Sequence, residues 1–224
     1  MRPSPRAALL FDLDGTMLHT DPIHFAIYRD LMAARGIAID QAFYDRHVLG
    51  RLNTDVFRDF LPDEADPQGL SDAKEAEFRR RLPRPFPATP GLGRLLDRAE
   101  HAGLGLAVVT NANPLNAEAM LAAIGLRDRF AVVISGETCA RGKPFPDPYL
   151  TAMDRLGVAP RDCIAFEDSP SGIRAATDAG AFVIGLRSTL DDAALRAAGA
   201  HLTLADFTDP ALEESLTRLE GVSS

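Results

Sequence analysis

Short apolar runs alternate with amphipathic segments along most of the chain. The runs are too short for helices and end at polar or glycine-rich residues, which is typical of strands buried on both faces of a parallel sheet. The amphipathic segments start beside a proline and end at a glycine, as helices commonly do. The repeated order of strand and helix predicts an open, doubly wound, mostly parallel α/β sheet. The expected strands span residues 7–13, 104–110, 131–135, 163–167 and 181–186, and helices are expected to begin near Thr89, Pro114, Pro146 and Ser169.

Residues 20–85 interrupt this alternation. The segment is rich in helix-forming and charged residues and shows no strand pattern. Its exit, residues 82–91, contains four prolines, which favour an extended and stiff connection. We therefore expect a core made of residues 1–19 and 86–224, and an inserted helical cap domain at residues 20–85.

Composition and charge narrow the class of protein. The chain has 24 Lys and Arg against 32 Asp and Glu, a net charge of −8, which argues against a nucleic-acid partner. The apolar run at residues 7–11 is too short for a signal peptide or a membrane span. Two cysteines are too few for a disulfide framework. We expect a cytoplasmic protein without a membrane partner, a monomer or a weak homo-oligomer.

Two closely spaced carboxylates follow the first expected strand. Asp12 and Asp14 stand in the sequence FDLDGT, where residues two apart on a strand point to the same side and Gly15 permits a turn. Because neighbouring carboxylates repel each other, one of them tends to hold a proton, which suits a nucleophile paired with an acid/base. For this motif alone, a pair of acids that caps a turn is the alternative interpretation.

Further polar groups follow the later expected strands. They are Thr110 at the end of one strand, Lys143 in a loop before a helix, and Glu167 and Asp168 at the end of another strand. Because ligands bind beyond the carboxyl ends of parallel strands, these groups converge if their strands are neighbours. Hard oxygen ligands select a hard divalent cation such as Mg²⁺, and the cation and the lysine neutralise a phosphoryl group. The sequence therefore predicts a site for a small phosphate ester.

Four segments resemble, in order, the motifs of the haloacid dehalogenase superfamily. They are DLDGT, the VTN around Thr110, GKPFPDPYL around Lys143, and EDSPSG. The resemblance covers about residues 6–206, and the helical insert is similar to the C1 cap subclass. It implies that Asp12 attacks phosphorus to form an aspartyl phosphate and that Asp14 acts as acid and base. It also implies that Thr110 and Lys143 bind the phosphoryl oxygens.

The same resemblance implies the metal ligands. Asp12, the backbone carbonyl of Asp14, Glu167 and Asp168 would hold Mg²⁺ directly or through water, with Asp168 as a direct ligand. Halide-releasing and phosphonate-cleaving relatives characteristically lack an acid at the position of Asp14. The resemblance therefore favours phosphate-ester chemistry.

The expected cap carries candidates for substrate binding. His24 and Lys74 match places where phosphomutases of the β-phosphoglucomutase type keep a histidine and a lysine, although cap phosphatases have both as well. The alternatives are a helix-surface histidine and a solvated lysine paired with Glu75 or Glu77.

Gly50, Arg51 and Asn53 are the other candidates on the cap. Mutases place an arginine three residues after the glycine, where this chain has Asn53, and Arg51 is the nearest substitute. Asn113 stands where mutases tend to carry a lysine. A second phosphate would therefore lack charged donors, which favours hydrolysis.

Asn111 follows Thr110 directly and is a candidate donor to the ligand, or else it satisfies a turn. The resulting hypothesis is a Mg²⁺-dependent phosphatase for a small phosphate monoester of the sugar phosphate or phosphoglycolate type. A sugar phosphomutase is one alternative. The alternative from another class is a non-catalytic phosphate-sensing module similar to receiver domains, which the cap and Asp14 disfavour.

Overall fold

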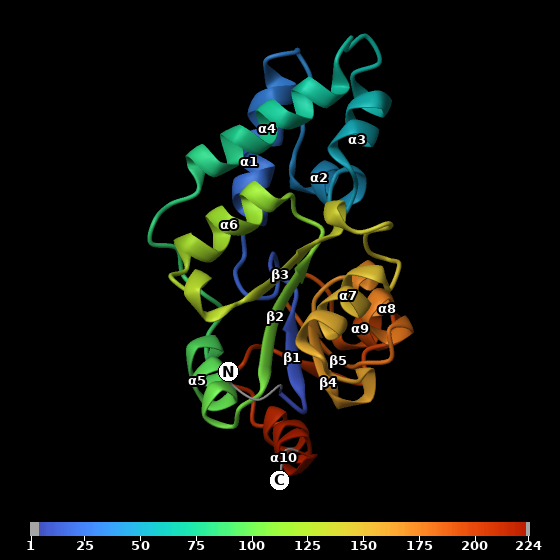
Figure 1. Ribbon diagram of the computed structural model, residues 1–224. Coiled ribbons are helices and arrows are strands. Elements are labelled where there is room, and N and C mark those ends of the chain that lie inside the picture. Colours follow the sequence, from blue (N-terminus) through green and yellow to red (C-terminus); the bar gives the residue numbers. More distant parts are fainter. Residues whose placement is uncertain (1–4, 223–224) are drawn as a thin grey trace. The chain divides into compact units, whose positions relative to one another are not determined.

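The chain folds into two compact units (Figure 1). The computed structural model describes residues 5–222. Residues 20–83 form a helical unit, and the chain before and after them forms an α/β unit. This helical unit ends two residues before the expected boundary at residue 85.

The α/β unit is built on a parallel sheet with strand order β3-β2-β1-β4-β5-β6. The doubly wound α/β class predicted above is therefore confirmed. The sixth strand was not predicted, because three residues at the edge of a sheet are too few to show a pattern. The strands are β1 (Ala8–Phe11), β2 (Gly105–Thr110), β3 (Val132–Ser135), β4 (Cys163–Glu167), β5 (Phe182–Leu186) and β6 (Leu202–Leu204).

The strand order places the first strand at the centre. Leu10 of β1 is in register with Ala107 of β2 on one side and with Ala165 of β4 on the other. The chain therefore reverses its winding at β1, and the carboxyl ends of β1, β2 and β4 lie next to one another. A ligand site is expected at this switch point.

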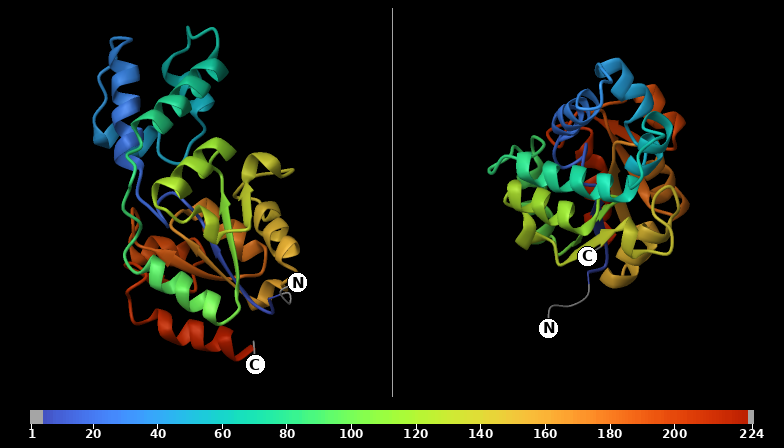
Figure 2. Two further views of the ribbon diagram at one scale, coloured as in Figure 1. Left: turned by 60° about the vertical axis from the view of Figure 1, so that its left-hand side comes forward. Right: turned by 90° about the horizontal axis from the view of Figure 1, so that it is seen from above.

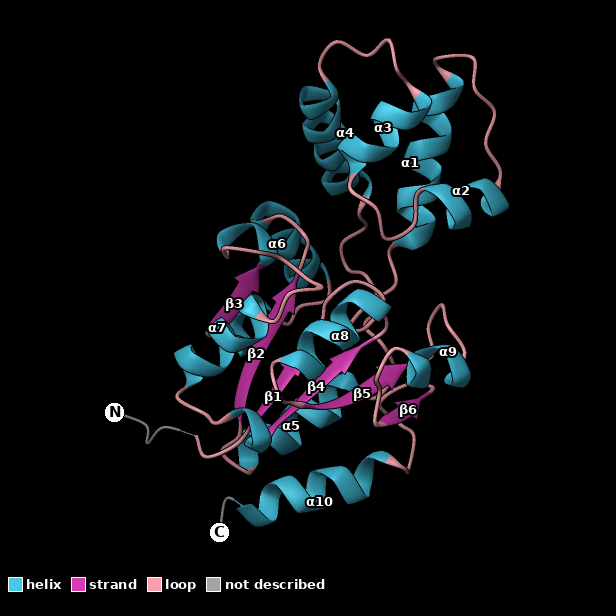
Figure 3. Ribbon diagram, turned by 90° about the vertical axis from the view of Figure 1, so that its right-hand side faces the viewer, coloured by secondary structure: helices cyan, strands magenta, loops and turns pink. Residues whose placement is uncertain are grey.

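Helices cover both faces of the sheet. Figure 3 shows α7 and α8 on one face and α5 and α10 on the other. The helices α5 and α10 lie side by side (Figure 2), and Arg98 of α5 donates to Glu213 of α10 at 2.6 Å. The helices are α5 (Leu92–His101), α6 (Pro114–Ala123), α7 (Asp147–Leu156), α8 (Pro170–Asp178), α9 (Asp192–Ala197) and α10 (Leu212–Val222).

The strands are apolar throughout because both faces are buried. Leu10 joins the core beneath α7 and α8. Phe11, its neighbour, stacks on Phe166 with ring centroids 4.9 Å apart. Both side chains are fully buried. This two-sided burial explains why the strand sequences are runs rather than alternations.

The helix starts follow the expected punctuation with one exception. Asn113 and Ser169 cap α6 and α8, since each side chain accepts a backbone N–H of the first turn. The helix expected to begin near Thr89 instead follows Gly91, whose φ of +83° suits glycine. The Thr89 hydroxyl donates to the carbonyl of Thr16 at 2.8 Å, so this threonine anchors the loop and does not cap the helix.

The helical unit has a small core of its own. Tyr28, Tyr44 and Phe57 are buried among aliphatic side chains, so these aromatic residues build the core of the unit. The described part of this unit contains no strand. Its helices are α1 (Asp21–Ala33), α2 (Gln41–His47), α3 (Asn53–Phe60) and α4 (Pro67–Arg81). Among residues 5–222, no helix is both long and apolar enough to span a membrane.

Candidate active site

Polar side chains gather where β1, β2 and β4 end. Strand β1 ends at Phe11, two residues earlier than expected, so Asp12 and Asp14 lie in the turn that follows it. Gly15 in this turn has a φ of +85°, and a Cβ there would lie 2.1 Å from Oδ2 of Asp168. Glycine is therefore required where the first turn packs against the acidic end of β4.

Lys143 is the centre of the cluster. Its Nζ donates to Oδ1 of Asp12 at 2.6 Å, to Oε1 of Glu167 at 2.5 Å, and to the carbonyl of Val109 at 2.7 Å. The lysine, both carboxylates and the bonds between them are buried. All three ammonium donors are thus used, and the lysine ties the ends of three strands together.

Burial and mutual repulsion shift the ionisation of the acids. Burial raises the pKa of Asp12 to about 7, with Glu167 and Asp14 adding to the rise and Lys143 opposing it. Burial, together with Asp12, Glu167 and Asp14, holds the pKa of Asp168 well above its usual range. Burial alone would lower the pKa of Lys143, but Asp12 and Glu167 outweigh it and raise that pKa. One lysine therefore cannot neutralise all of these acids in their ionised forms, and without a further cation Asp12 and Asp168 are driven toward their protonated forms.

Three of the carboxyl groups are placed as the ligands of one metal ion would be. Asp12, Glu167 and Asp168 each offer a carboxylate oxygen, and these oxygens lie within 4.8 Å of one another. With all three ionised, the carboxylates against one ammonium would leave two negative charges in a buried place, which a divalent cation would balance. Oxygen donors with this charge fit a hard divalent cation of the Mg²⁺ type.

Thr110 and Asn111 shape the loop after β2. Thr110 ends the strand and is buried, and its Oγ1 accepts the N–H of Ala112 at 3.1 Å. The side-chain oxygen of Asn111 accepts the backbone N–H of Lys143 at 3.0 Å, and its nitrogen donates to the Lys143 carbonyl at 3.0 Å. Asn111 therefore holds the lysine loop, and contact of Asn111 with substrate stays a prediction.

Several supporting residues escaped the sequence analysis. Tyr149 donates to Oε1 of Glu167 at 2.7 Å, and Ser169 donates to Oε2 at 3.2 Å. Thr16 and Ser188 donate to Asp168 at 3.4 and 3.2 Å. Thr16, Tyr149 and Ser169 lie inside the motifs quoted above, where their hydroxyl groups are the signal that could have identified them. Ser188 follows β5 and carries no local signal.

His24 and Lys74 lie together in the helical unit. Lys74 Nζ lies 2.8 Å from Nδ1 of His24 and donates to Glu75 at 2.9 Å. The His24 ring stacks on Phe78 with centroids 4.2 Å apart. Lys74 is only 5% exposed, so its interpretation as a solvated charge is wrong. Of the two acids proposed as its partner, the structure shows Glu75, whereas Glu77 bonds to arginines.

The other three cap candidates have different surroundings. Asn53 is occupied within the unit, where it accepts from Tyr28 at 2.6 Å and donates to Glu75 at 2.7 Å. Arg51 pairs with Asp59 at 2.6 Å. Gly50 is exposed with a φ of +74°, and a Cβ there would meet nothing within 4 Å.

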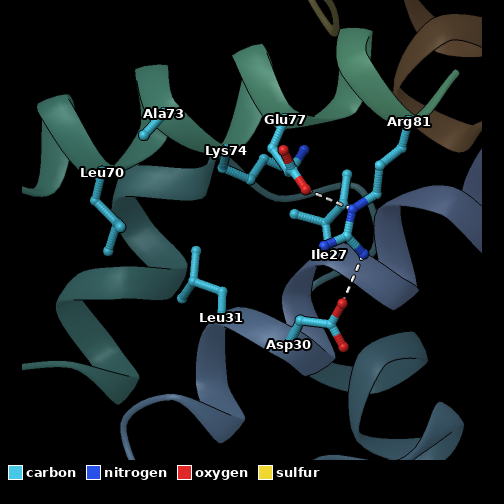
Figure 4. Close-up of a pocket in the computed structure, with 8 residues that line it drawn as sticks. All are labelled: Ile27, Asp30, Leu31, Leu70, Ala73, Lys74, Glu77 and Arg81. Carbon is cyan, nitrogen blue, oxygen red and sulfur yellow. Dashed lines mark hydrogen bonds and ion pairs between the residues drawn. The ribbon is translucent and has the colours of Figure 1, made fainter.

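Two cavities of about 210 Å³ lie away from the carboxylate cluster. One lies between α1 and α4 (Figure 4), where Leu31 and Leu70 face its interior and Arg81 bonds to Glu77 and Asp30 at one end. The other lies between α10 and the amino ends of β4 and β5, at the end of the sheet opposite the carboxylates. None of the cluster residues Asp12, Lys143, Glu167 and Asp168 lines either cavity.

Comparison with known proteins agrees with this site. Residues 7–180 match the family described as haloacid dehalogenase-like hydrolase. The chain is 37% identical over 181 residues to a phosphoglycolate phosphatase of Xylella fastidiosa, covering 77% of this chain and 76% of that protein. It is 30% identical over 204 residues to the fructose-1-phosphate phosphatase YqaB of Escherichia coli, covering 81% and 96%.

A solved structure gives the same result for the fold. CbbY of Rhodobacter sphaeroides, crystallised with phosphate, superposes with a TM-score of 0.76 at 30% identity, covering 90% of this chain and 94% of that one. The family match includes the three strands that converge at the carboxylate cluster. The chain therefore belongs to the haloacid dehalogenase-like hydrolases.

Proposed function

We propose that this enzyme is a Mg²⁺-dependent phosphatase that hydrolyses a small phosphate monoester through an aspartyl phosphate on Asp12. The observation that carries the proposal is the buried cluster in which Lys143 bonds to both Asp12 and Glu167 beside Asp168. A lysine and excess carboxylates at the switch point suit chemistry in which charge on a phosphoryl group must be neutralised.

Two displacements at phosphorus complete the reaction. In the first, a carboxylate oxygen of Asp12 forms a bond to phosphorus while the bond to the ester oxygen breaks, and Asp14 gives its proton to the leaving alkoxide. In the second, Asp14 takes a proton from water, whose oxygen attacks phosphorus. The Asp12 carboxylate leaves and inorganic phosphate is released.

Asp12, the backbone carbonyl of Asp14, Glu167 and Asp168 would hold the metal. When bound, Mg²⁺ supplies positive charge that offsets the negative charge of the carboxylates and of the phosphoryl oxygens. Asp12 and Asp168 need that charge most, since burial among other acids raises the pKa of both.

Lys143 and Thr110 would bind the phosphoryl oxygens. The bonds of Lys143 to Asp12 and Glu167 place its charge before the phosphoryl group arrives, and because all three of its donors are used, one of these bonds must be exchanged for a bond to a phosphoryl oxygen. The bond from Ala112 N–H orients the Thr110 hydroxyl oxygen at the end of β2. Such prior positioning of charge and of the hydroxyl limits the reorganisation needed during the reaction.

The relatives and the helical unit support hydrolysis of a monoester. Two of the relatives are named for phosphoglycolate and fructose 1-phosphate, both small monoesters. Arg51 already pairs with Asp59, and Asn53 bonds to Tyr28 and Glu75. These two positions therefore offer little charge for a second phosphate, which a mutase would have to hold.

Phosphate release from a panel of sugar phosphates, phosphoglycolate and nucleoside monophosphates tests the proposal. We expect release with Mg²⁺, none with EDTA, and none from Asp12→Asn. Isomerisation of β-glucose 1-phosphate without net release would instead identify a mutase. A folded protein that is silent in both assays would contradict catalysis and favour the phosphate-sensing alternative. If Arg51→Ala and Lys74→Ala leave the ranking of substrates unchanged, these residues do not set specificity.

A further inference from the structure

A chain of polar contacts crosses the helical unit from α3 through α4 to α1. Nδ2 of Asn53 donates to Oε1 of Glu75 at 2.7 Å, and Nζ of Lys74 donates to the same oxygen at 2.9 Å. Lys74 Nζ also lies 2.8 Å from Nδ1 of His24. Tyr28 donates to Oδ1 of Asn53 at 2.6 Å, which fixes the orientation of that amide. Each of these helices thus contributes a residue to one connected network.

The contact between Lys74 and His24 determines where the imidazole holds its proton. An ammonium group has donors and no acceptor, so Nδ1 must accept, and the ring is neutral with its proton on Nε2. The parallel stacking of the ring on Phe78, with an interplanar angle of 4°, fixes the plane in which that N–H points. His24 is therefore a directed hydrogen-bond donor through Nε2.

The buried ammonium depends on Glu75. The Lys74 side chain is 4% exposed and the Glu75 side chain 18%, and a buried cation without a counter-charge is strongly unfavourable. Burial alone would raise the pKa of Glu75, but the Lys74 ammonium and the hydrogen bonds from Lys74 and Asn53 outweigh it and lower that pKa. Glu75 therefore stays ionised at neutral pH and places a negative charge against the Lys74 ammonium beside the imidazole.

We propose that Glu75, oriented by Asn53, is a positioning residue that holds Lys74 against His24 and so fixes the Nε2–H form of the imidazole. This inference rests on the proposed function, because His24 and Lys74 are cap candidates for binding the substrate of that reaction. It gives Asn53 a role in the network in place of direct contact with a phosphate. It also explains why a carboxylate is placed directly beside a lysine in a unit expected to bind an anion.

Nitrogen-15 NMR of the histidine rings in the labelled full chain tests the proposal. The chain has five histidines, and His24→Gln assigns the resonance. In the wild type we expect an unprotonated, hydrogen-bonded Nδ1. Glu75→Gln should shift this resonance and populate both neutral forms, because Lys74 loses the negative charge of Glu75. A protonated Nδ1 in the wild type, or an unchanged spectrum in the variant, would overturn the proposal.

The matched control lies on the same helix. Figure 4 shows Glu77 bonded to Arg81, which in turn bonds to Asp30, so this acid pairs with arginine and not with Lys74. Glu77→Gln should change thermal stability and leave the His24 spectrum as in the wild type. An equal change in both variants would mean that any lost acid on α4 disturbs the ring. If Glu75→Gln does not fold, Asn53→Ala must move the resonance in the same direction.

Activity separates this inference from the proposed function. Glu75→Gln should lower kcat by about tenfold, as misplacing a binding group does, whereas Glu77→Gln should not. If the wild type releases no phosphate, the proposed function fails whatever the spectra show. If the wild type is active and the Glu75→Gln spectrum is unchanged, the proposed function stands and the positioning role is refuted.

Discussion

Replacing the proposed nucleophile should stabilise the metal-free protein. Burial, helped by Glu167 and Asp14, raises the pKa of Asp12 from 3.8 to about 7 in the folded chain. A group with a raised folded pKa contributes stability below its unfolded pKa and loses it as pH rises through the folded value. Asp12→Asn places a neutral group of the same shape there, so this loss disappears. We expect the variant to be more stable than the wild type at neutral and alkaline pH in EDTA.

The size of the effect follows from the shift. One pKa unit corresponds to about 1.4 kcal/mol, so the rise from 3.8 to about 7 amounts to about 4 kcal/mol above pH 7. The bond from Lys143 to Asp12 opposes the rise and is already included in it. The difference between variant and wild type should shrink toward zero at about pH 4, where the aspartate is protonated in the folded protein.

Urea unfolding followed by far-ultraviolet circular dichroism measures the difference, since the chain has no tryptophan for fluorescence. Wild type and Asp12→Asn are compared in EDTA at about pH 4 and pH 8, and again with Mg²⁺. Free Mg²⁺ at 100 times its Kd adds about 2.7 kcal/mol to the free energy of unfolding. Mg²⁺ should therefore narrow the stability difference between the two proteins by stabilising the wild type. A variant less stable than the wild type at pH 8 in EDTA would refute the electrostatic reasoning.

Three further outcomes are expected. Tyr149→Phe removes a donor to buried Glu167 and should lower the free energy of unfolding in urea by about 1.5–3 kcal/mol. It should also weaken Mg²⁺ binding, measured by calorimetry, about tenfold. An unchanged Mg²⁺ affinity would show that this bond does not orient the carboxylate. Gly172→Ala puts a Cβ 2.0 Å from the Glu167 carboxylate and should lower the free energy of unfolding by about 1–3 kcal/mol. The control Gly93→Ala places its Cβ in open space and should cause no loss of stability. Equal changes in Tm would contradict the close approach at Gly172. The pKa of Glu75 is lowered, so its contribution to stability exists above about pH 4.5 and is lost as pH falls through the folded pKa. The Tm of Glu75→Gln should therefore lie below that of the wild type at pH 7 and converge with it in acid. A Tm difference that persists in acid would exclude this charge effect.

The parallel sheet was predictable from the sequence because both faces of each central strand are buried. Such strands are continuous apolar runs, and β4 lies at the residues expected for it, 163–167. The edge strand β6 and the helix α9 were missed, since each is only a few residues long. The start of α5 was misplaced because Thr89 has the chemistry of a cap but bonds instead to Thr16, 73 residues earlier.

The contacts between side chains could be predicted from the sequence at the carboxylate cluster but not in the helical unit. Lys143 and Asp12 are separated by 131 residues, yet their meeting could be expected, because the carboxyl ends of neighbouring parallel strands share one edge. No comparable rule connects helices of an inserted unit. Asn53 was predicted to bind substrate from its distance to a glycine, and this stays a prediction, but its bond to Glu75, 22 residues away, follows from the packing of α3 on α4 and could not be predicted. Since that acid also holds the cap lysine, substitutions on the cap should alter the reaction through hydrogen-bond geometry as well as through direct contact.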